Sequence, residues 1–381
     1  MDQKETKKKR KKQSYSKKIT ALTFLGLLLV FGIMSLVSMG HKEHKPQASA
    51  IGMLNGRFAE EYEQYFKEDF SGKGIFKALN HSVEKILGKR ESNGVYQGKK
   101  HYLAEKIQTM DEKSVEKNVK AIQEFQDLHY NIPGYFMLVP NAANIQKDKL
   151  PAAAVPKDQS EQFAKIRKKL GESVTWVDAE TALKEHKNEE IYYHTDEHWT
   201  TLGAFYGYEA LTTSMNLDKG QLPKMKSYVV TNDFNGSLAK KSGYENGYEE
   251  SIRIYSTKNV KDNTRLVMTN ADTKKKSATL YDTSKLEESD KYGLFPGYES
   301  GLTDIETTVD TTERLLLFKD SYANCMLPFL VSHFREIVVI DPEYYKGNVQ
   351  EIMQNKKFTR ILYLYSGNSF VTDEKLNTVL K

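Results

Sequence analysis

The sequence contains one cysteine, Cys325, among 381 residues, and it has only two tryptophans and nine prolines. A single thiol cannot form an internal disulfide, so the folded part of the chain must be stabilised by its hydrophobic core alone. For a protein outside the cytoplasm, this scarcity fits a Gram-positive bacterial surface better than a disulfide-rich eukaryotic one. Apart from the segment 194–198, the sequence has no group of histidine, cysteine and acidic residues with metal-ligand spacing. We expect neither a metal nor a cofactor.

Beyond the first 18 residues, neither positive nor negative charge is in large excess. The net charge of +5 comes largely from this tail, residues 1–18, which includes the basic run Lys7 to Lys12. Because the remainder is close to neutral, we expect no nucleic-acid-binding surface. We interpret the basic tail as a cytoplasmic topology signal that contacts the membrane surface.

A long uncharged run occurs at Ile19 to Met39, which spans 21 residues. At a rise of about 1.5 Å per residue, it is long enough to cross a hydrocarbon core of about 30 Å. The basic tail before it predicts a single-pass protein of the cell membrane with a cytoplasmic N-terminus and an extracellular C-terminal domain. The alternative is a cleaved signal peptide ending near Ala48 to Ala50. The charged segment 41–45 and the length of the run favour an uncleaved anchor.

The remaining chain divides into a linker, residues 40–55, and an extracytoplasmic domain, residues 56–381. Alternation of apolar strand patterns with amphipathic helices predicts an α/β domain with a parallel sheet flanked by helices. In such sheets, ligands bind at the carboxyl ends of the strands. Residues 221–311 are polar and have short strand patterns, so we interpret them as a β-rich insertion or lid; a solvated irregular region fits the pattern equally well. The predicted strands are 95–97, 134–140, 174–177, 251–255, 265–268, 314–319, 336–340 and 360–365, and the predicted helices lie within 56–87 and at 115–129, 162–170, 321–334 and 349–355.

The segment from His194 to Trp199 concentrates two histidines, two acids and a tryptophan in six residues. Asp196 and His198 are two positions apart, so an extended or looped backbone would project both side chains to the same side. A carboxylate in that position can orient an imidazole and stabilise its protonated form, as a catalytic base requires. A helix is predicted to begin after an N-cap at Thr200 or Thr201. A metal site formed by His194, Asp196 and His198 is the weaker interpretation, because a loop triplet rarely completes a zinc site.

A candidate nucleophile, Ser321, follows the predicted strand 314–319. At a strand-to-helix turn, free backbone N–H groups and the helix dipole favour a developing oxyanion. His198 could activate this serine after folding. From this segment alone an N-cap role for Ser321 is preferable, but together with the D-x-H pattern a nucleophile becomes the better interpretation. We interpret Cys325, four residues later, as a buried inert thiol.

Two segments, 195–211 (TDEHWTTLGAFYGYEAL) and 315–330 (LLLFKDSYANCMLPFL), resemble the DHHW protein family. That family is similar to the periplasmic alginate O-acetyltransferases of the SGNH-hydrolase type. The resemblance implies an SGNH-hydrolase-like fold and a catalytic triad of Asp196, His198 and Ser321. Glu197 stands where the family name places a histidine, which indicates that position 197 is not a required base.

The resemblance leaves the oxyanion site open, because Lys319 stands where standard SGNH hydrolases have a glycine. Asn368, after the last predicted strand, could donate to the oxyanion as an asparagine does in those hydrolases. A turn role for Gly367 and Asn368 fits equally well. Tyr322 and Asn324, beside the serine, are further candidates for this site.

The resemblance therefore predicts a membrane-anchored O-acetyltransferase or acetylesterase that acts on a cell-surface or secreted polysaccharide. A membrane-bound O-acyltransferase would be its partner and would supply the acyl group. The alternative is a non-catalytic protein that binds glycan or helps to assemble a polysaccharide-modification complex, since fold does not fix function. The unusual Lys319 keeps this alternative open.

Overall fold

We describe the fold from a computed structural model, which defines residue 26 and residues 90–217, 226–244, 248–256 and 265–381. The predicted tail, membrane helix, linker and first helices of the extracytoplasmic domain lie outside the part that is described. Within that part, no helix has the length and apolar character needed to cross a bilayer.

A mixed eight-stranded sheet forms the centre of the domain, with the strand order β5-β4-β13-β11-β12-β10-β8-β9. The first five strands in this order run parallel, as the sequence predicts, whereas the last three pair antiparallel. The strands are β4 (Gly134–Val139), β5 (Thr175–Val177), β8 (Leu266–Asn270), β9 (Lys276–Ser277), β10 (Leu302–Thr307), β11 (Arg314–Lys319), β12 (Glu336–Ile340) and β13 (Arg360–Ser366).

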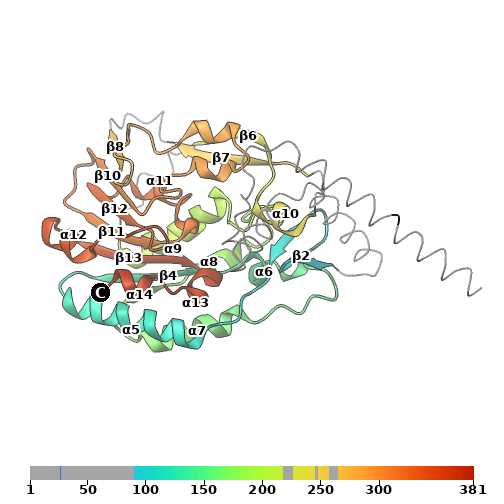
Figure 1. The fold of residues 1–381 in the computed structure, drawn as a ribbon, viewed down its shortest axis with the longest axis horizontal. Helices are drawn as coiled ribbons and strands as arrows, with labels where there is room; N and C mark the ends of the chain where they lie inside the picture. The colour runs from blue at the N-terminus through green and yellow to red at the C-terminus, as the bar shows by residue number, and fades with distance from the viewer. Residues whose placement is uncertain (1–25, 27–89, 218–225, 245–247, 257–264) are drawn as a thin grey trace, which may run out of the picture. The chain divides into compact units, whose positions relative to one another are not determined.

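Helices cover both faces of this sheet (Figure 1). One face packs against α6 (Ala142–Ile145), α8 (Ala179–Glu185), α9 (Thr201–Met215) and α11 (Leu327–Leu330). The other packs against α5 (Glu112–Leu128), α7 (Gln159–Leu170), α12 (Val349–Asn355), α13 (Gly367–Thr372) and α14 (Leu376–Val379). Strands covered on both sides need apolar residues on both sides. In β11, Leu315 and Leu317 accordingly enter one core, while Leu316 and Phe318 enter the other.

The polar region that was interpreted as an insertion or lid contributes to two parts of the domain. Strands β8, β9 and β10 extend the central sheet, and β6 (Lys226–Phe234) pairs with β7 (Glu250–Ser256) in a separate hairpin. The remaining elements of this region are α10 (Ser237–Ser242) and the 3-10 helices η3 (Thr283–Glu287) and η4 (Lys291–Leu294). Strands β7 and β8 lie at the two strand positions predicted for this region.

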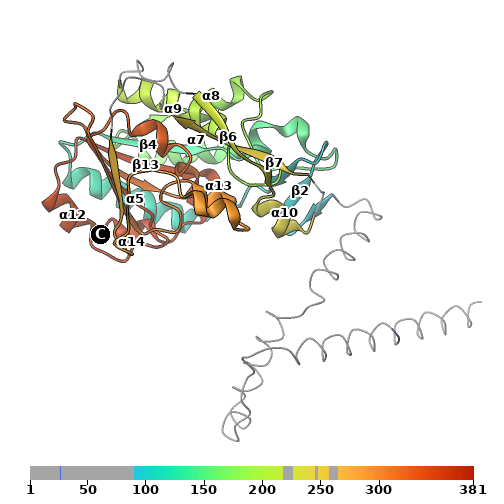
Figure 2. The same ribbon diagram turned by 90° about the horizontal axis from the view of Figure 1, so that it is seen from above.

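A small antiparallel sheet of β1 (Glu91–Ser92), β2 (Val95–Gln97) and β3 (Leu103–Glu105) lies beside α10 (Figure 2). A separate apolar cluster joins these elements: Val95 and Leu103 of the sheet pack with Leu238 of α10. Part of the polar region is thereby attached to the start of the described domain.

The continuous helix predicted over 321–334 is wrong. The structure instead has a short 3-10 helix, η5 (Ser321–Ala323), followed by the four-residue α11, in which Pro328 is at the first turn. Proline lacks a backbone N–H and its ring is tolerated only at the start of a helix, so a helix cannot continue through this position. The chain therefore turns sharply after the serine.

Candidate active site

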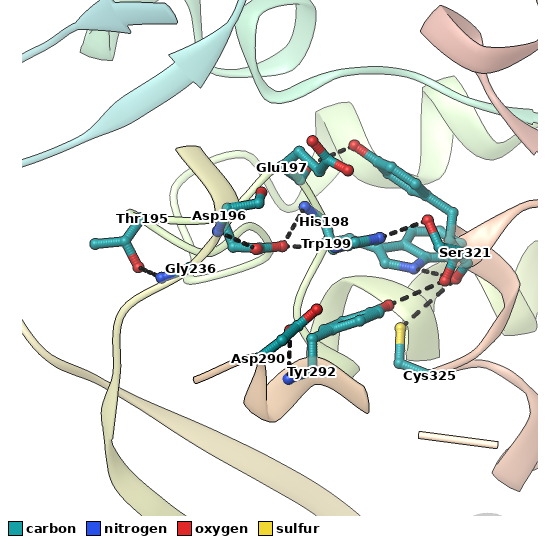
Figure 3. A network of polar contacts seen from close by, with 12 residues as sticks. Thr195, Asp196, Glu197, His198, Trp199, Gly236, Asp290, Tyr292, Ser321 and Cys325 are labelled. Carbon is teal, nitrogen blue, oxygen red and sulfur yellow. Dashed lines mark hydrogen bonds and ion pairs between the residues drawn. The ribbon is translucent and has the colours of Figure 1, made fainter. Parts of the chain in front are cut away.

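Three predicted side chains meet at the carboxyl edge of the parallel strands (Figure 3). His198 Nδ1 lies 2.5 Å from Asp196 Oδ1, and His198 Nε2 lies 2.7 Å from Ser321 Oγ. Asp196 and His198 come from the loop before α9, and Ser321 from the turn after β11. The fold thus joins residues 123 positions apart into an acid–base–hydroxyl chain.

The loop that carries the base is fixed to the turn that carries the serine. Trp199 is fully buried, and its Nε1 donates to the Tyr322 carbonyl at 2.8 Å. Helix α9 approaches the indole closely, because a Cβ at Gly207 would lie 2.6 Å from the Trp199 ring. The absence of a side chain at Gly207 therefore allows α9 to pack closely against the buried indole of Trp199.

Residues of the polar region contact Asp196 and the loop just before it. The backbone N–H of Ser237 donates to Asp196 Oδ2 at 2.8 Å, and a Cβ at Gly236 would lie 2.3 Å from Asp196 Cβ. The Glu250 carboxylate accepts hydrogen bonds from the backbone N–H groups of His194 and Thr195, each at 2.8 Å. Sequence reasoning missed Gly236, Ser237 and Glu250, because their partners are 40 or more residues away in the chain.

Two tyrosines contact the imidazole of His198. The ring of Tyr292 stacks on it, with 3.8 Å between the ring centroids and an interplanar angle of 9°. The Tyr292 hydroxyl donates to the Ser321 carbonyl at 3.2 Å. Tyr322 lies at 5.0 Å from the imidazole, and its hydroxyl donates to the Glu197 carbonyl. Tyr322 was a candidate from sequence, whereas no local signal marked Tyr292.

The charges of the site favour a basic histidine. Burial by itself lowers the pKa of His198, but the charge and hydrogen bond of Asp196 outweigh burial and raise it above its ordinary value. Burial likewise opposes ionisation of Asp196, yet His198 and the backbone N–H groups of Ser237 and His198 lower the pKa of Asp196 to about 2. The aspartate therefore remains charged, as an orienting carboxylate must.

Glu197, between these two residues in sequence, behaves differently. Burial, together with the charges of Asp196 and Glu105, raises the pKa of Glu197 to about 7, although His198 and Lys241 act in the opposite direction. Glu197 and His198 are neighbours in the chain, and the charge of each shifts the pKa of the other.

The side-chain amide of Asn368 forms its hydrogen bonds with residues other than Ser321. Its Nδ2 donates to Glu105 Oε2 at 2.8 Å and to the Lys106 carbonyl at 2.9 Å, while its Oδ1 accepts from the Gln108 N–H. An asparagine amide has two N–H groups, so none remains for an oxyanion in this conformation. Asn368 lies at the start of α13 and joins it to the segment after β3, which corrects the oxyanion role considered for it.

Two other residues bear on the oxyanion. The backbone N–H of Ser321 donates to no acceptor within the described residues. Asn324 is 1% exposed, its N–H donates to the Ser321 carbonyl, and its Oδ1 has no partner in the part of the chain that the structure defines. Among the described residues, the Ser321 N–H is therefore available to donate a hydrogen bond to a group bound at the serine.

Lys319 has a structural explanation. Its side chain is 1% exposed, and Nζ donates to Asp341 Oδ2 at 2.7 Å and to the Gly297 carbonyl at 2.9 Å. The lysine that replaces the glycine of standard hydrolases thus forms a buried ion pair with the residue that follows β12.

The metal and thiol alternatives receive no support from the geometry. His194 Nε2 pairs with Glu190 Oε2 at 2.8 Å and so does not join Asp196 and His198 in a ligand set. Burial raises the pKa of Cys325 to about 12, so this thiol stays protonated and a poor nucleophile at neutral pH.

The described domain is thus a mixed α/β sheet with helices on both faces, and Ser321, His198 and Asp196 form a hydrogen-bonded chain at its carboxyl edge. The chain belongs to the DHHW family: the sequence model of that family, described as DHHW protein, matches residues 106–340.

Solved structures share the fold. A DHHW family protein from Eubacterium siraeum matches with a TM-score of 0.65 and 22% identity, over 75% of this chain and 95% of that one. Bacillus cereus PatB1 matches with a TM-score of 0.61 and 21% identity, over 74% of this chain and 98% of that one. PatB1 with a sulfonyl adduct matches with a TM-score of 0.60 and 20% identity, over 74% and 96% of the two chains. No curated protein matches the sequence.

Proposed function

We propose that the protein is a carbohydrate O-acetyltransferase or acetylesterase that uses Ser321 as its nucleophile. The observation that carries this proposal is the unbroken hydrogen-bonded chain of Asp196, His198 and Ser321, with contacts of 2.5 and 2.7 Å. Side chains in this order are able to remove a proton from the serine and return it to a leaving group.

In the proposed first step, Ser321 Oγ attacks the acetyl carbonyl carbon while His198 Nε2 accepts the hydroxyl proton. The Asp196 carboxylate accepts a hydrogen bond from the Nδ1–H of His198 and stabilises the imidazolium. The Ser321 N–H donates to the oxyanion, whose collapse expels the donor alcohol with the proton from His198. A sugar hydroxyl or water then attacks the acetyl-serine, with His198 again as the base, and releases the serine.

The cellular setting of the proposal rests on sequence. The basic tail and the apolar run Ile19 to Met39 support a single-pass anchor with the catalytic domain outside the cell. A polysaccharide of the cell surface is then the accessible substrate, and a membrane-bound O-acyltransferase is the partner that would deliver acyl groups.

The alternative is a non-catalytic protein that binds glycan or helps to assemble a polysaccharide-modification complex, since fold does not fix function. Lys319, which favoured this alternative in the sequence, forms a buried ion pair with Asp341.

The test uses the full chain purified in detergent with a chromogenic acetyl ester. Ser321→Ala should abolish ester hydrolysis with an unchanged melting temperature. The matched control is Ser284→Ala, in η3, whose hydroxyl bonds only to Asp282 among the described residues. Hydrolysis that survives in Ser321→Ala rejects the proposal.

A second readout does not depend on turnover. Because one PatB1 structure holds a sulfonyl adduct, a sulfonyl fluoride is a suitable probe. Mass spectrometry should locate the adduct on Ser321, and His198→Ala should slow the labelling.

A further inference from the structure

A cavity of about 420 Å³ opens beside Ser321 at the carboxyl edge of the sheet. This volume lies within the range of small-ligand sites. Its floor is buried, with Lys319 at 1% and Tyr365 at 3% exposure, and its rim is exposed. The residues that line it include Lys319, Ser321, Asp341, Glu343, Tyr344 and Tyr365.

The floor of the cavity contains an unsatisfied hydroxyl. Tyr365 Oη is buried and has no hydrogen-bond partner within the described residues. Buried tyrosine hydroxyls normally find a partner, and an unpaired one costs free energy. Tyr365 lines the cavity, and burial, followed by the charges of Asp373, Asp341 and Asp320 around it, raises the pKa of its hydroxyl.

The walls carry an excess of negative charge. Five carboxylates line the cavity, against two lysines. The buried pair of Lys319 with Asp341 cancels one charge of each sign, so Asp320, Glu343, Asp373 and Glu374 remain against Lys375. The excess is three negative charges when all four carboxyl groups are ionised, and burial raises the pKa of both Asp320 and Asp373.

These carboxylates act on one another. Burial raises the pKa of Asp373 first, and the negative charges of Asp320 and Glu343 raise it further. The Asp320 carboxylate accepts hydrogen bonds from the N–H groups of Tyr322 and Ser366, which fix its place beside the nucleophile. A cation placed among these groups would relieve their repulsion, whereas an anion would add to it.

The rim supplies an apolar surface as well. Tyr344 is 44% exposed and lines the cavity next to Glu343. An exposed aromatic ring can pack against a sugar ring and can attract a cation through its face. Negative charge, an aromatic rim and a hydroxyl in need of a partner are together suited to a cationic sugar.

We propose that this cavity binds a glycan residue with a free ammonium group, a hexosamine unit, as the acyl acceptor beside Ser321. This inference rests on the proposed acyl transfer. The ammonium ion is bound by the carboxylates and stays protonated, so it is not nucleophilic. The acceptor is therefore a hydroxyl of the same glycan: its oxygen bonds to the acetyl carbon, the bond to Ser321 Oγ breaks, and its proton passes through His198 to the serine.

Binding is measured on the full chain in detergent, with Ser321→Ala as the background so that turnover does not interfere. The three probes are a glucosamine trisaccharide, the matched N-acetylglucosamine trisaccharide and a trigalacturonate, titrated by calorimetry. We expect the amino sugar to bind at least tenfold more tightly than the neutral one, and the uronate not to bind. Added salt should weaken binding of the amino sugar.

Two sets of variants test the cavity itself. Glu343→Gln combined with Glu374→Gln should weaken amino-sugar binding at least tenfold, whereas Glu172→Gln should not change it. Glu172 is exposed and precedes β5, at the opposite edge of the sheet. Tyr365→Phe should weaken binding without lowering the melting temperature, because the hydroxyl has no protein partner in the described part of the chain.

Equal binding of the three probes, tighter binding of the uronate, no binding of the amino sugar, or an unchanged affinity in the Glu343/Glu374 variant would overturn the inference. These outcomes are separate from the ester test. Ser321-dependent hydrolysis without amino-sugar binding removes only the substrate class. Amino-sugar binding with hydrolysis that does not need Ser321 removes the acyl-transfer proposal and, with it, the acceptor role of the cavity.

Discussion

The indole of Trp199 donates a hydrogen bond of 2.8 Å to the backbone carbonyl of Tyr322. Trp199 directly follows the base, His198, and Tyr322 directly follows the nucleophile, Ser321. Together with the hydrogen bond of the Tyr322 hydroxyl to the Glu197 carbonyl, this contact holds together the two loops that must meet for proton transfer.

Replacing Trp199 with phenylalanine should lower both stability and activity. The ring remains buried, but the Tyr322 carbonyl loses its donor, so we expect a loss of about 1–2 kcal/mol in the free energy of unfolding. A small displacement of the loops should also reduce kcat for ester hydrolysis about tenfold. Trp176→Phe, in β5 on the other face of the sheet, is the matched control. Equal kcat values for the two variants would contradict this role.

The pH dependence of hydrolysis should report the protonation of His198. The base must be neutral, so kcat/KM should rise with pH and level off above an inflection that lies higher than about 6.5. The Asp196 charge raises the pKa of His198; Asp196→Asn should therefore move the inflection to lower pH. The same change should reduce kcat by about 10⁴ through loss of the correct tautomer. An inflection that stays in place would argue against the pairing.

Glu197 should affect the pH profile but not the chemistry. Its negative charge contributes to the raised pKa of His198. Glu197→Gln should therefore shift the inflection to lower pH and leave kcat at pH 8.5 within about twofold of the parent. Loss of activity at high pH would instead identify Glu197 as a required group.

Ser237→Pro isolates the backbone hydrogen bond to Asp196. Ser237 is the first residue of α10 and follows Gly236 in extended conformation, so proline is compatible with the backbone. The change removes the N–H that donates to Asp196 Oδ2. We expect kcat to fall about tenfold or more, the value of one hydrogen bond to a charged group. Ser237→Ala keeps the N–H and should retain full activity; a similar loss in both variants would refute this explanation.

The buried pair of Lys319 and Asp341 should stabilise the turn before the serine. Lys319→Met leaves a buried carboxylate without its partner, so we expect a loss of about 3–5 kcal/mol in the free energy of unfolding. Adding Asp341→Asn removes the unpaired charge and should restore a large part of that loss. Denaturant titration of the parent, the single variants and the double variant measures the coupling.

Local patterns predicted much of the fold. The strands Arg314–Lys319 and Glu336–Ile340 and the helix Val349–Asn355 have the bounds expected from sequence. Burial on both faces requires a continuous apolar run in a strand, and such a run is visible without knowledge of the fold. The helix expected over 321–334 was wrong because Pro328 outweighed its apolar residues.

The candidate site was only partly predictable. Sequence identified Asp196, His198 and Ser321, because their residue types and spacing resemble a family pattern. It did not identify Tyr292, whose ring stacks on His198. It also left the role of Asn368 open, and the amide of Asn368 bonds to a segment about 260 residues earlier. Ring stacking and amide partners depend on which distant segments the fold places together.

Sequence by itself thus determined the apolar strands, the residue types of the acid–base–hydroxyl chain and membership in the DHHW family. Only the tertiary structure decided that the chain closes, since the contact between His198 and Ser321 spans 123 residues. It also decided that the polar region supports Asp196 and that acids gather around a cavity beside the serine. The physical reason is that the apolar periodicity of a strand or helix depends on residues close together in the sequence. The hydrogen bonds and electrostatic fields of a site instead arise between segments that meet only after packing.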